Sequence, residues 1–341
     1  MAFRVLVVGD KFIPASAYEE QWKKMKGDNL QGVDLDLRTV EWDLSKAEQH
    51  RSQQVMEWDG ANAVAAPPQI LSELDGVHAI VVHFAPVNAE IILAAPELKM
   101  VAVARAGLEN VDHETAAAAG VFVTGVAGRN AAAVAELAIG LMLAECRNIS
   151  RADHSIKDGG WRKEFSVPMV ELGESTIGII GWGQVARKLA KKLAGLAQEI
   201  LVYDPFVSAA AINAAGARAV SFDDIFEHSD FVHVMARLTP ETERFIGREQ
   251  FKLMKASAYF INTSRSRLVD YEALLEALTL NTIAGAGLDV FDNEPLPDDS
   301  PWRELDNVTM TTHYGGETAG TNSTSARLVL DAITAFIQAG K

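Results

Sequence analysis

Short apolar runs separated by amphipathic stretches recur along the whole chain. Continuous apolar runs of this length are typical of parallel strands buried on both faces, and the stretches between them are typical of crossover helices. The pattern therefore predicts an α/β fold with parallel sheets. The first series of runs lies at residues 4–9, 79–84, 100–105 and 120–125, and the second at 177–181, 199–204, 230–235, 258–263, 283–290 and 307–312.

Two further segments define the expected domain organisation. Residues 131–160 have helical spacing and end at paired glycines, so we expect one long helix between two α/β units. After residue 313 a polar stretch leads into an amphipathic helix that has no strand of its own to cover, and this helix should return to the first unit. We expect two Rossmann-like, doubly wound parallel-sheet domains with a cleft between them. Residues 1–103 and 314–341 would form one domain, and residues 104–313 the nucleotide-binding domain.

Composition narrows the class of protein. The 341 residues are 48% hydrophobic, enough for two sizeable cores. A net charge of -15 would repel a nucleic acid or an anionic membrane, so neither is an expected partner. The single cysteine, Cys146, excludes an internal disulfide and a multi-thiolate metal site, and no metal is expected. The apolar run near the N-terminus is too short for a secretory signal, and residues 131–146 are too few to cross a membrane, so a cytoplasmic location is expected.

A glycine-rich turn follows the strand predicted at 177–181. The order Gly181-Trp-Gly183-Gln-Val-Ala186 is typical of a dinucleotide site, where glycines allow a tight turn and a close approach of the backbone to a pyrophosphate. The next strand ends at Asp204, which could accept the ribose hydroxyls and would repel the extra phosphate of NADP. We therefore expect NAD. The alternative is a loop of small residues in which Asp204 only caps the turn before Pro205.

Three later strand ends carry groups suited to hydride-transfer chemistry, which needs a proton carrier and a cation for an acidic substrate. The ends of parallel strands meet at the ligand crevice of an open α/β sheet. Taken singly, His313 is one of eight histidines and Glu294 is one acid of a charged loop. The candidates in chain order are Arg265 and Arg267, then Asp289, Asp292 and Glu294, then His313.

From about residue 70 to about residue 320 the chain closely resembles the D-isomer-specific 2-hydroxyacid dehydrogenase family. The resemblance lies in the motifs "RAGLENVDHETAAAAGVFVT", "GRNAAAVAELAIGLMLA", "GIIGWGQVARKLA", "RLTPETERFIG", "INTSRSRLVDYEAL", "GLDVFDNEPLP" and "THYGG", in that order. It implies hydride transfer between the nicotinamide of NAD and the α-carbon of a small D-2-hydroxy acid or 2-keto acid. It also implies a homodimer, in which an arm carrying Trp161 and Arg162 would cross to the partner.

Residue roles follow from the same resemblance. Arg265 would bind the substrate carboxylate, Glu294 would hold the imidazole, and His313 would be the general acid/base. A carboxylate at Glu294 would favour the protonated ring, so the pair should titrate as a unit. The implied cofactor contacts are Gly181, Gly183, Gln184, Val185, Asp204, Thr239, Thr263, Ser264, Arg265, Asp289, His313 and Gly315. The implied substrate contacts are His83, Phe84, Arg105, Gly107, Leu108 and Arg265.

Some residues depart from the family pattern. Ser266 stands where a glycine usually follows the arginine, Thr312 and Ala127 stand where prolines are usual, and Met235 stands where many relatives have a histidine. Two rival functions remain. A formate dehydrogenase would have a glutamine beside the histidine, and Glu294 argues against it; a non-catalytic NAD-sensing module would lack turnover. The substrate stays open, because Arg105, Arg129 and Arg162 would suit a phosphorylated acid.

Overall fold

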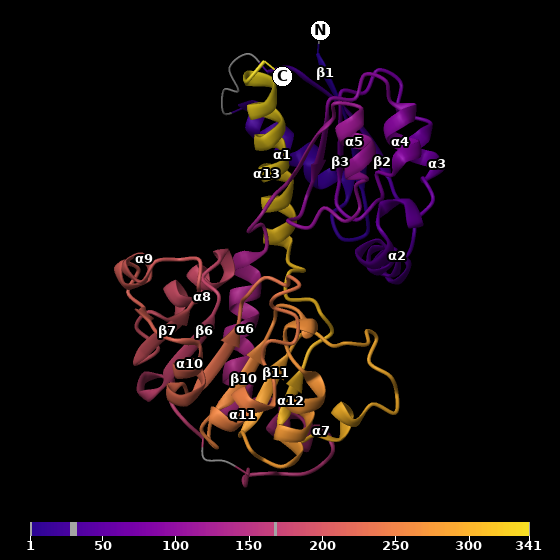
Figure 1. The fold of residues 1–341 in the computed structure, drawn as a ribbon. Helices are drawn as coiled ribbons and strands as arrows, with labels where there is room; N and C mark the ends of the chain where they lie inside the picture. Colours follow the sequence, from indigo (N-terminus) through magenta and orange to yellow (C-terminus); the bar gives the residue numbers. More distant parts are fainter. Residues whose placement is uncertain (1, 28–32, 167–168, 341) are drawn as a thin grey trace. The chain divides into compact units, whose positions relative to one another are not determined.

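Every strand pairing in the computed structural model, which describes residues 2–27, 33–166 and 169–340, is parallel. The strands form one sheet of five and one of seven, each within its own unit (Figure 1). The first unit comprises residues 1–130 and 317–341, and the second comprises residues 131–316. The predicted α/β class with two doubly wound parallel sheets is confirmed.

The first unit contains the five-stranded sheet, in the order β2-β1-β3-β4-β5. Its strands are β1 (Phe3–Gly9), β2 (Leu35–Glu41), β3 (Ala79–Val82), β4 (Met100–Val103) and β5 (Phe122–Gly125). Its helices are α1 (Ala15–Gly27), α2 (Lys46–Asp59), α3 (Pro68–Leu71), α4 (Ala89–Ala94), α5 (His113–Ala118) and α13 (Ala319–Gln338).

The second unit contains the seven-stranded sheet, in the order β12-β11-β10-β9-β6-β7-β8. Chain order reverses direction between β6 and β9, which is the point where open α/β sheets bind ligands. The strands are β6 (Thr176–Ile180), β7 (Glu199–Tyr203), β8 (Arg218–Ala219), β9 (Phe231–Val234), β10 (Tyr259–Asn262), β11 (Gly285–Leu288) and β12 (Val308–Met310). The helices are α6 (Ala131–Cys146), α7 (Ile149–Lys157), α8 (Gln184–Leu193), α9 (Ala209–Ala214), α10 (Phe222–His228), α11 (Arg248–Leu253) and α12 (Tyr271–Thr279).

Apolar side chains cover both faces of each sheet. In the second unit, Phe231 of β9 belongs to one buried cluster and its neighbour Val232 belongs to another. Helix α6 lies close against β11, because a side chain at Gly287 would meet Leu141 at 2.8 Å. These two features explain the near-continuous apolar runs of the strands and the glycines within β11.

The C-terminal helix α13 packs within the first unit, beside α1 (Figure 1). Leu330 and Ile333 of α13 lie in the same buried cluster as Tyr18 and Trp22 of α1. An amphipathic helix of this kind is held by burial of its apolar face, at about 25 cal/mol for each Å² removed from water.

Three expectations need correction. The first unit extends to residue 130 rather than 103, because β5 pairs with β4 and so joins the first sheet. Residues 131–160 form two helices instead of one, because Asn148 has the left-handed backbone (φ 52°) that ends α6 and begins α7. The strand runs also omitted β2, an edge strand of mixed exposure, and β8, which has only two residues.

None of the helices in the described part of the chain combines the length and the hydropathy that crossing a bilayer requires.

Candidate active site

The glycine turn after β6 has the geometry that a dinucleotide needs. Gly181 has φ +95°, and a side chain there would lie 2.9 Å from the backbone of Ala236. Gly183 begins α8 without a side-chain cap, and a side chain there would meet nothing within 4 Å. The uncapped N–H groups of Gln184 and Val185 therefore face an open position suited to phosphate, and the helix dipole favours an anion at the same end.

Asp204 follows β7 and is hydrogen-bonded to the glycine turn. Its Oδ2 accepts from the N–H of Trp182 at 2.7 Å, and its Oδ1 accepts from the N–H of Phe206 at 2.8 Å. Each carboxylate oxygen can accept a further hydrogen bond. The carboxylate is thus fixed beside the turn with acceptor capacity for ribose hydroxyls. These observations fit NAD in this turn.

The three predicted catalytic residues follow three adjacent strands. Arg265 comes after β10, Glu294 after β11 and His313 after β12, and these strands are neighbours in the order β12-β11-β10. All three strands are parallel, so their carboxyl ends lie on the same edge of the sheet. The topology therefore brings together residues that are up to 48 positions apart in the sequence.

His313 and Glu294 are in direct contact. The Nδ1 atom of His313 lies 2.7 Å from Oε2 of Glu294, and Oε1 of Glu294 accepts the N–H of Phe291 at 2.8 Å. The side chain of Glu294 is 15% exposed and that of His313 is 33% exposed. A carboxylate can only accept, so a neutral His313 must carry its proton on Nδ1 here. Its Nε2 atom is then the one that would exchange a proton with a ligand.

The backbone at His313 is held by Asp289. His313 has φ 56°, a region that residues with a β-carbon seldom adopt. Asp289, 2% exposed, accepts from Thr311 Oγ1 at 2.6 Å, from the N–H of Tyr314 at 3.2 Å and from the N–H of Gly315 at 3.0 Å. A strained backbone persists when its surroundings determine it, and these bonds do so. The carboxylate of Asp289 thus positions the loop that carries His313, and its predicted cofactor contact stays a prediction.

The two arginines after β10 have different surroundings. Arg267 forms two bonds to Glu243 Oε1, at 3.1 and 2.7 Å. Arg265 is exposed, donates from Nη1 to the carbonyl of Ser264, and forms no ion pair among the described residues. Since Arg267 is committed to an internal carboxylate, Arg265 is the better candidate for a ligand carboxylate.

The turn between β10 and Arg265 is shaped by Asn262. Its side chain donates to the carbonyl of Arg265 at 3.1 Å and accepts from the N–H of Ser264 at 3.0 Å. Ser264 donates to the carbonyl of Val234, and Thr263 has a buried hydroxyl without a partner in the described residues. Thr239 bonds through its N–H to Thr242 at 2.8 Å. Asn262 was missed from the sequence, although an asparagine just before a polar turn is a known signal.

The substrate loops predicted near residues 83 and 107 lie in the first unit. No hydrogen bond is formed by the N–H of Gly107 or Leu108 within residues 2–27, 33–166 and 169–340, so both are open donors for a carboxylate. Arg105 is buried and forms an ion pair with Glu109 at 2.8 Å. His83 is also buried, and both of its ring nitrogens contact other side chains of this unit, so its ring is occupied internally. Phe84 is half-buried beside it.

The arm after α7 is pinned by its own chain. Arg162 forms two bonds to Asp306, at 2.8 and 2.7 Å, which leaves it less suited to a substrate phosphate. Trp161 beside it is 75% exposed.

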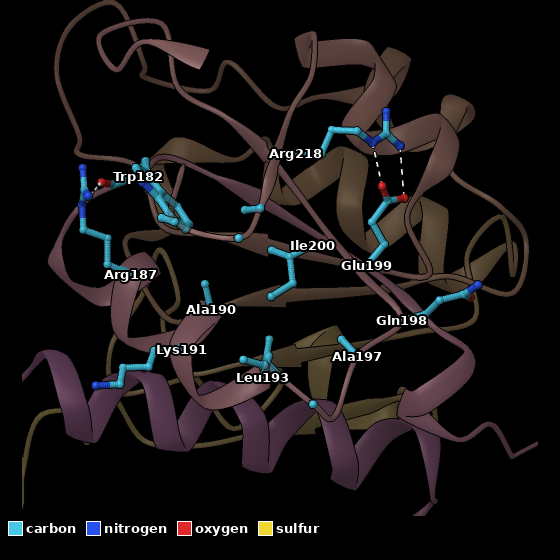
Figure 2. Close-up of a pocket in the computed structure, with 15 residues that line it drawn as sticks. Trp182, Arg187, Ala190, Lys191, Leu193, Ala197, Gln198, Glu199, Ile200 and Arg218 are labelled. Atoms are coloured by element: carbon cyan, nitrogen blue, oxygen red, sulfur yellow. Dashed lines mark hydrogen bonds and ion pairs between the residues drawn. The ribbon is translucent and has the colours of Figure 1, made fainter. Parts of the chain in front are cut away.

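A separate pocket of about 790 Å³ is lined by residues of α8, β7 and β8 and by the segments between them. Figure 2 shows it between Arg187 and Lys191 on one side and Gln198, Glu199 and Arg218 on the other. Ile200 and Leu193 contribute apolar lining, and Arg218 is paired with Glu199. The pocket includes none of Arg265, Glu294 and His313. The candidate site for proton transfer therefore lies at the carboxyl ends of β10, β11 and β12, and the volume of this pocket does not indicate its position.

Comparison with known proteins agrees with this geometry. The sequence profile of the D-isomer specific 2-hydroxyacid dehydrogenase NAD-binding domain matches residues 139–315. A glyoxylate reductase of Korarchaeum cryptofilum is 36% identical over 74% of this chain and 76% of its own. A D-3-phosphoglycerate dehydrogenase of Archaeoglobus fulgidus is 40% identical over 68% of this chain, which spans only 44% of that protein.

The fold also matches solved structures. The NAD-complexed D-isomer specific 2-hydroxyacid dehydrogenase of Lactobacillus delbrueckii ssp. bulgaricus superimposes with a TM-score of 0.77 over 99% of this chain and 97% of that one, at 21% identity. At that identity the match establishes the fold, and the sequence matches establish the family. The chain belongs to the D-isomer-specific 2-hydroxyacid dehydrogenases, NAD-dependent oxidoreductases that act on CH–OH groups.

Proposed function

We propose that this protein interconverts a small D-2-hydroxy acid and its 2-keto acid, with His313 as general acid/base, Glu294 as its partner and Arg265 as the carboxylate anchor. The observation that carries the proposal is the 2.7 Å contact between His313 Nδ1 and Glu294 Oε2 at the edge of the sheet. Bound NAD would supply the hydride acceptor or donor.

The residues of the chain have distinct tasks in this proposal. In the oxidation direction neutral His313 takes the hydroxyl proton at Nε2, and Glu294 stabilises the imidazolium that forms. In the reduction direction the protonated ring returns that proton to the keto oxygen. Arg265 stays charged at any working pH and can grip a carboxylate with two parallel bonds. The open N–H groups of Gly107 and Leu108 are proposed as further carboxylate donors.

The test is an NADH-oxidation screen with glyoxylate, hydroxypyruvate and phosphohydroxypyruvate, run on the protein and on His313→Ala. We expect at least one acid to be reduced, and we expect the variant to bind NADH normally while losing nearly all turnover. Comparable turnover in His313→Ala would remove the histidine from the mechanism. A protein that binds NADH and reduces none of a wider panel of 2-keto acids would instead be a non-catalytic NAD sensor.

We infer a preference for NAD over NADP from Asp204. Its carboxylate is fixed by Trp182 and Phe206, so it cannot turn away from an extra ribose phosphate, and the repulsion would persist. Asp204→Ala should weaken NADH binding and bring the Kd for NADH closer to the Kd for NADPH. An unchanged ratio of these two Kd values would show that other residues determine the cofactor preference.

We also propose that two copies associate, in a reducing compartment such as the cytoplasm. Helix α7 buries none of its residues, and Ile149 and Ile156, seven positions apart on one face, are both exposed. Covering this face and the exposed Trp161 would remove apolar surface from water. Light scattering of the protein and of Ile156→Glu would test the association.

The lone Cys146 is buried and free, which suits a reducing compartment.

A further inference from the structure

Three side chains form a hydrogen-bonded chain inside the first unit that the proposed mechanism does not use. The Nδ1 atom of His83 lies 3.0 Å from Oδ2 of Asp10, and its Nε2 atom lies 2.9 Å from Nη2 of Arg129. Asp10 and His83 are each 2% exposed. Arg129 also donates from Nη1 to Ser325 on α13 at 3.3 Å. The network therefore joins the ends of β1 and β3 to the segment after β5 and to the C-terminal helix.

The direction of every bond in this network is determined by its two ends. A carboxylate only accepts and a guanidinium only donates. His83 must therefore donate from Nδ1 to Asp10 and accept at Nε2 from Arg129, which makes it a neutral ring with its proton on Nδ1. A second proton on Nε2 would face an N–H group of Arg129. Burial lowers the pKa of His83, which acts in the same direction.

The network also holds the loop after β3 in position. Asp10 accepts from the N–H groups of Phe12 at 2.9 Å, Ile13 at 2.7 Å and Phe84 at 3.2 Å, so one carboxylate ties two loops together. The ring of His83 stacks on that of Phe84 with centroids 4.0 Å apart. The guanidinium of Arg105 in turn lies over the Phe84 ring, 5.5 Å from its centroid. The position of the His83 ring therefore restrains Phe84, and through Phe84 it restrains Arg105, and both are predicted substrate contacts.

We infer that Asp10, His83 and Arg129 are positioning residues that determine substrate specificity, holding Phe84 and Arg105 in place while His83 itself carries no proton in the reaction. The inference rests on the proposed function for its kinetic consequence, but the state of the histidine ring is independent of turnover. Asp10 is not among the substrate contacts predicted from the motifs. Arg129 was predicted only as a group that would suit a phosphorylated acid, and in the structure its guanidinium is bonded to His83 and Ser325 instead.

The first measurement is the ¹⁵N spectrum of histidine-labelled protein at neutral pH. We expect the His83 ring to be neutral with its proton on Nδ1, assigned by comparison with His83→Gln. A charged ring, or a proton on Nε2, would overturn the proposed network. This readout requires no activity, so a protein that reduces none of the acids tested would overturn the proposed function and leave the network to be judged by the spectrum.

The second measurement compares three substitutions that alter the network in different ways. Arg129→Met removes the donor while keeping a long side chain, Arg129→Lys keeps a cationic donor, and His83→Gln keeps one donor and one acceptor but cannot exchange a proton. We expect Arg129→Met to raise KM for the keto acid roughly ten- to a hundred-fold, the usual effect of removing a partner from a buried polar group. The Kd for NADH should change less than about twofold, since the cofactor residues lie in the other unit.

Rescue separates positioning from proton transfer. Arg129→Lys should retain most of kcat/KM because it keeps a cationic donor. His83→Gln should lose less kcat/KM than Arg129→Met because it keeps one donor and one acceptor. If Arg129→Met keeps the native KM, the network does not set specificity. If His83→Gln loses kcat as completely as His313→Ala does, His83 carries a proton and the inference fails. Should Arg129→Met fold poorly by thermal unfolding, His83→Gln and the ¹⁵N spectrum still decide between these outcomes.

Discussion

Replacing Glu294 with glutamine should invert the hydrogen bond that orients the proposed proton carrier. Oε1 of Glu294 accepts from the N–H of Phe291 at 2.8 Å, so the oxygen of the introduced amide would stay there and its NH₂ group would face His313 Nδ1. An N–H group at that position requires Nδ1 to accept. The neutral ring would then carry its proton on Nε2, and the protonated ring would place one N–H against another.

The size of the effect follows from the contact. A charge-assisted hydrogen bond is worth about 1.5–3 kcal/mol, and we take about 2 kcal/mol because the His313 side chain is 33% exposed to solvent. At about 1.4 kcal/mol for each factor of ten, reduction at neutral pH should slow roughly 30-fold in kcat/KM. The pH profile of reduction should change as well, because a glutamine cannot stabilise the imidazolium that donates the proton. Oxidation should also slow, because Nε2 would already hold a proton.

The assay is the pH dependence of kcat/KM for NADH-dependent reduction by the native protein and by Glu294→Gln. Asp292→Asn is the matched control, because it removes the same charge from an exposed position two residues away. We expect the control to reproduce the native profile and both variants to bind NADH with native affinity. An unshifted profile with native kcat/KM in Glu294→Gln would refute the assignment of Glu294 as the partner of the proton carrier.

Two further predictions concern cofactor binding and stability. Gly181→Ala should lower both the melting temperature and NADH affinity, because position 181 has φ +95° and a β-carbon there would lie 2.9 Å from Ala236. Gly183→Ala should lower NADH affinity with little change in melting temperature, because a β-carbon there would meet nothing within 4 Å. Equal loss of stability in both would contradict this difference. His233 is fully buried without a partner among the described residues, and burial lowers its pKa to about 3. Because the unfolded ring has a pKa near 6.5 and binds the proton more tightly, the native state should lose stability as pH falls from 6.5, by about 2 kcal/mol at pH 5. In urea unfolding, the free energy of unfolding of His233→Leu should lack this loss between pH 6.5 and pH 5. If the free energy of unfolding of the variant depended on pH as it does in the native protein, the prediction would be contradicted.

The order of apolar runs was sufficient to predict the α/β class, because a strand buried on both faces leaves a continuous apolar run and its sheet must be covered by helices. Ten strands were predicted at positions that overlap β1, β3–β7 and β9–β12. The glycine spacing before α8 and Asp204 after β7 likewise predicted a dinucleotide turn, since φ +95° and an uncapped helix start are local properties. Edge strands β2 and β8 were missed, because a partly exposed or two-residue strand has no clear apolar run.

Long-range pairing was decided only by the tertiary structure. The end of the first unit at residue 130 depends on β5 joining β4, a contact between residues about 20 positions apart that no local pattern records. The resemblance had already selected Arg265 over Arg267, and the fold adds the physical reason, because Arg267 is paired with Glu243. The left-handed backbone of His313 depends on Asp289. Asp10, His83 and Arg129 lie far apart in sequence and acquire defined protonation only when folding brings a pure acceptor and a pure donor to opposite sides of one ring. The sequence determined which chemistry was available to this protein, whereas the fold determined which atoms it joins, because hydrogen-bond direction and burial exist only between residues in contact.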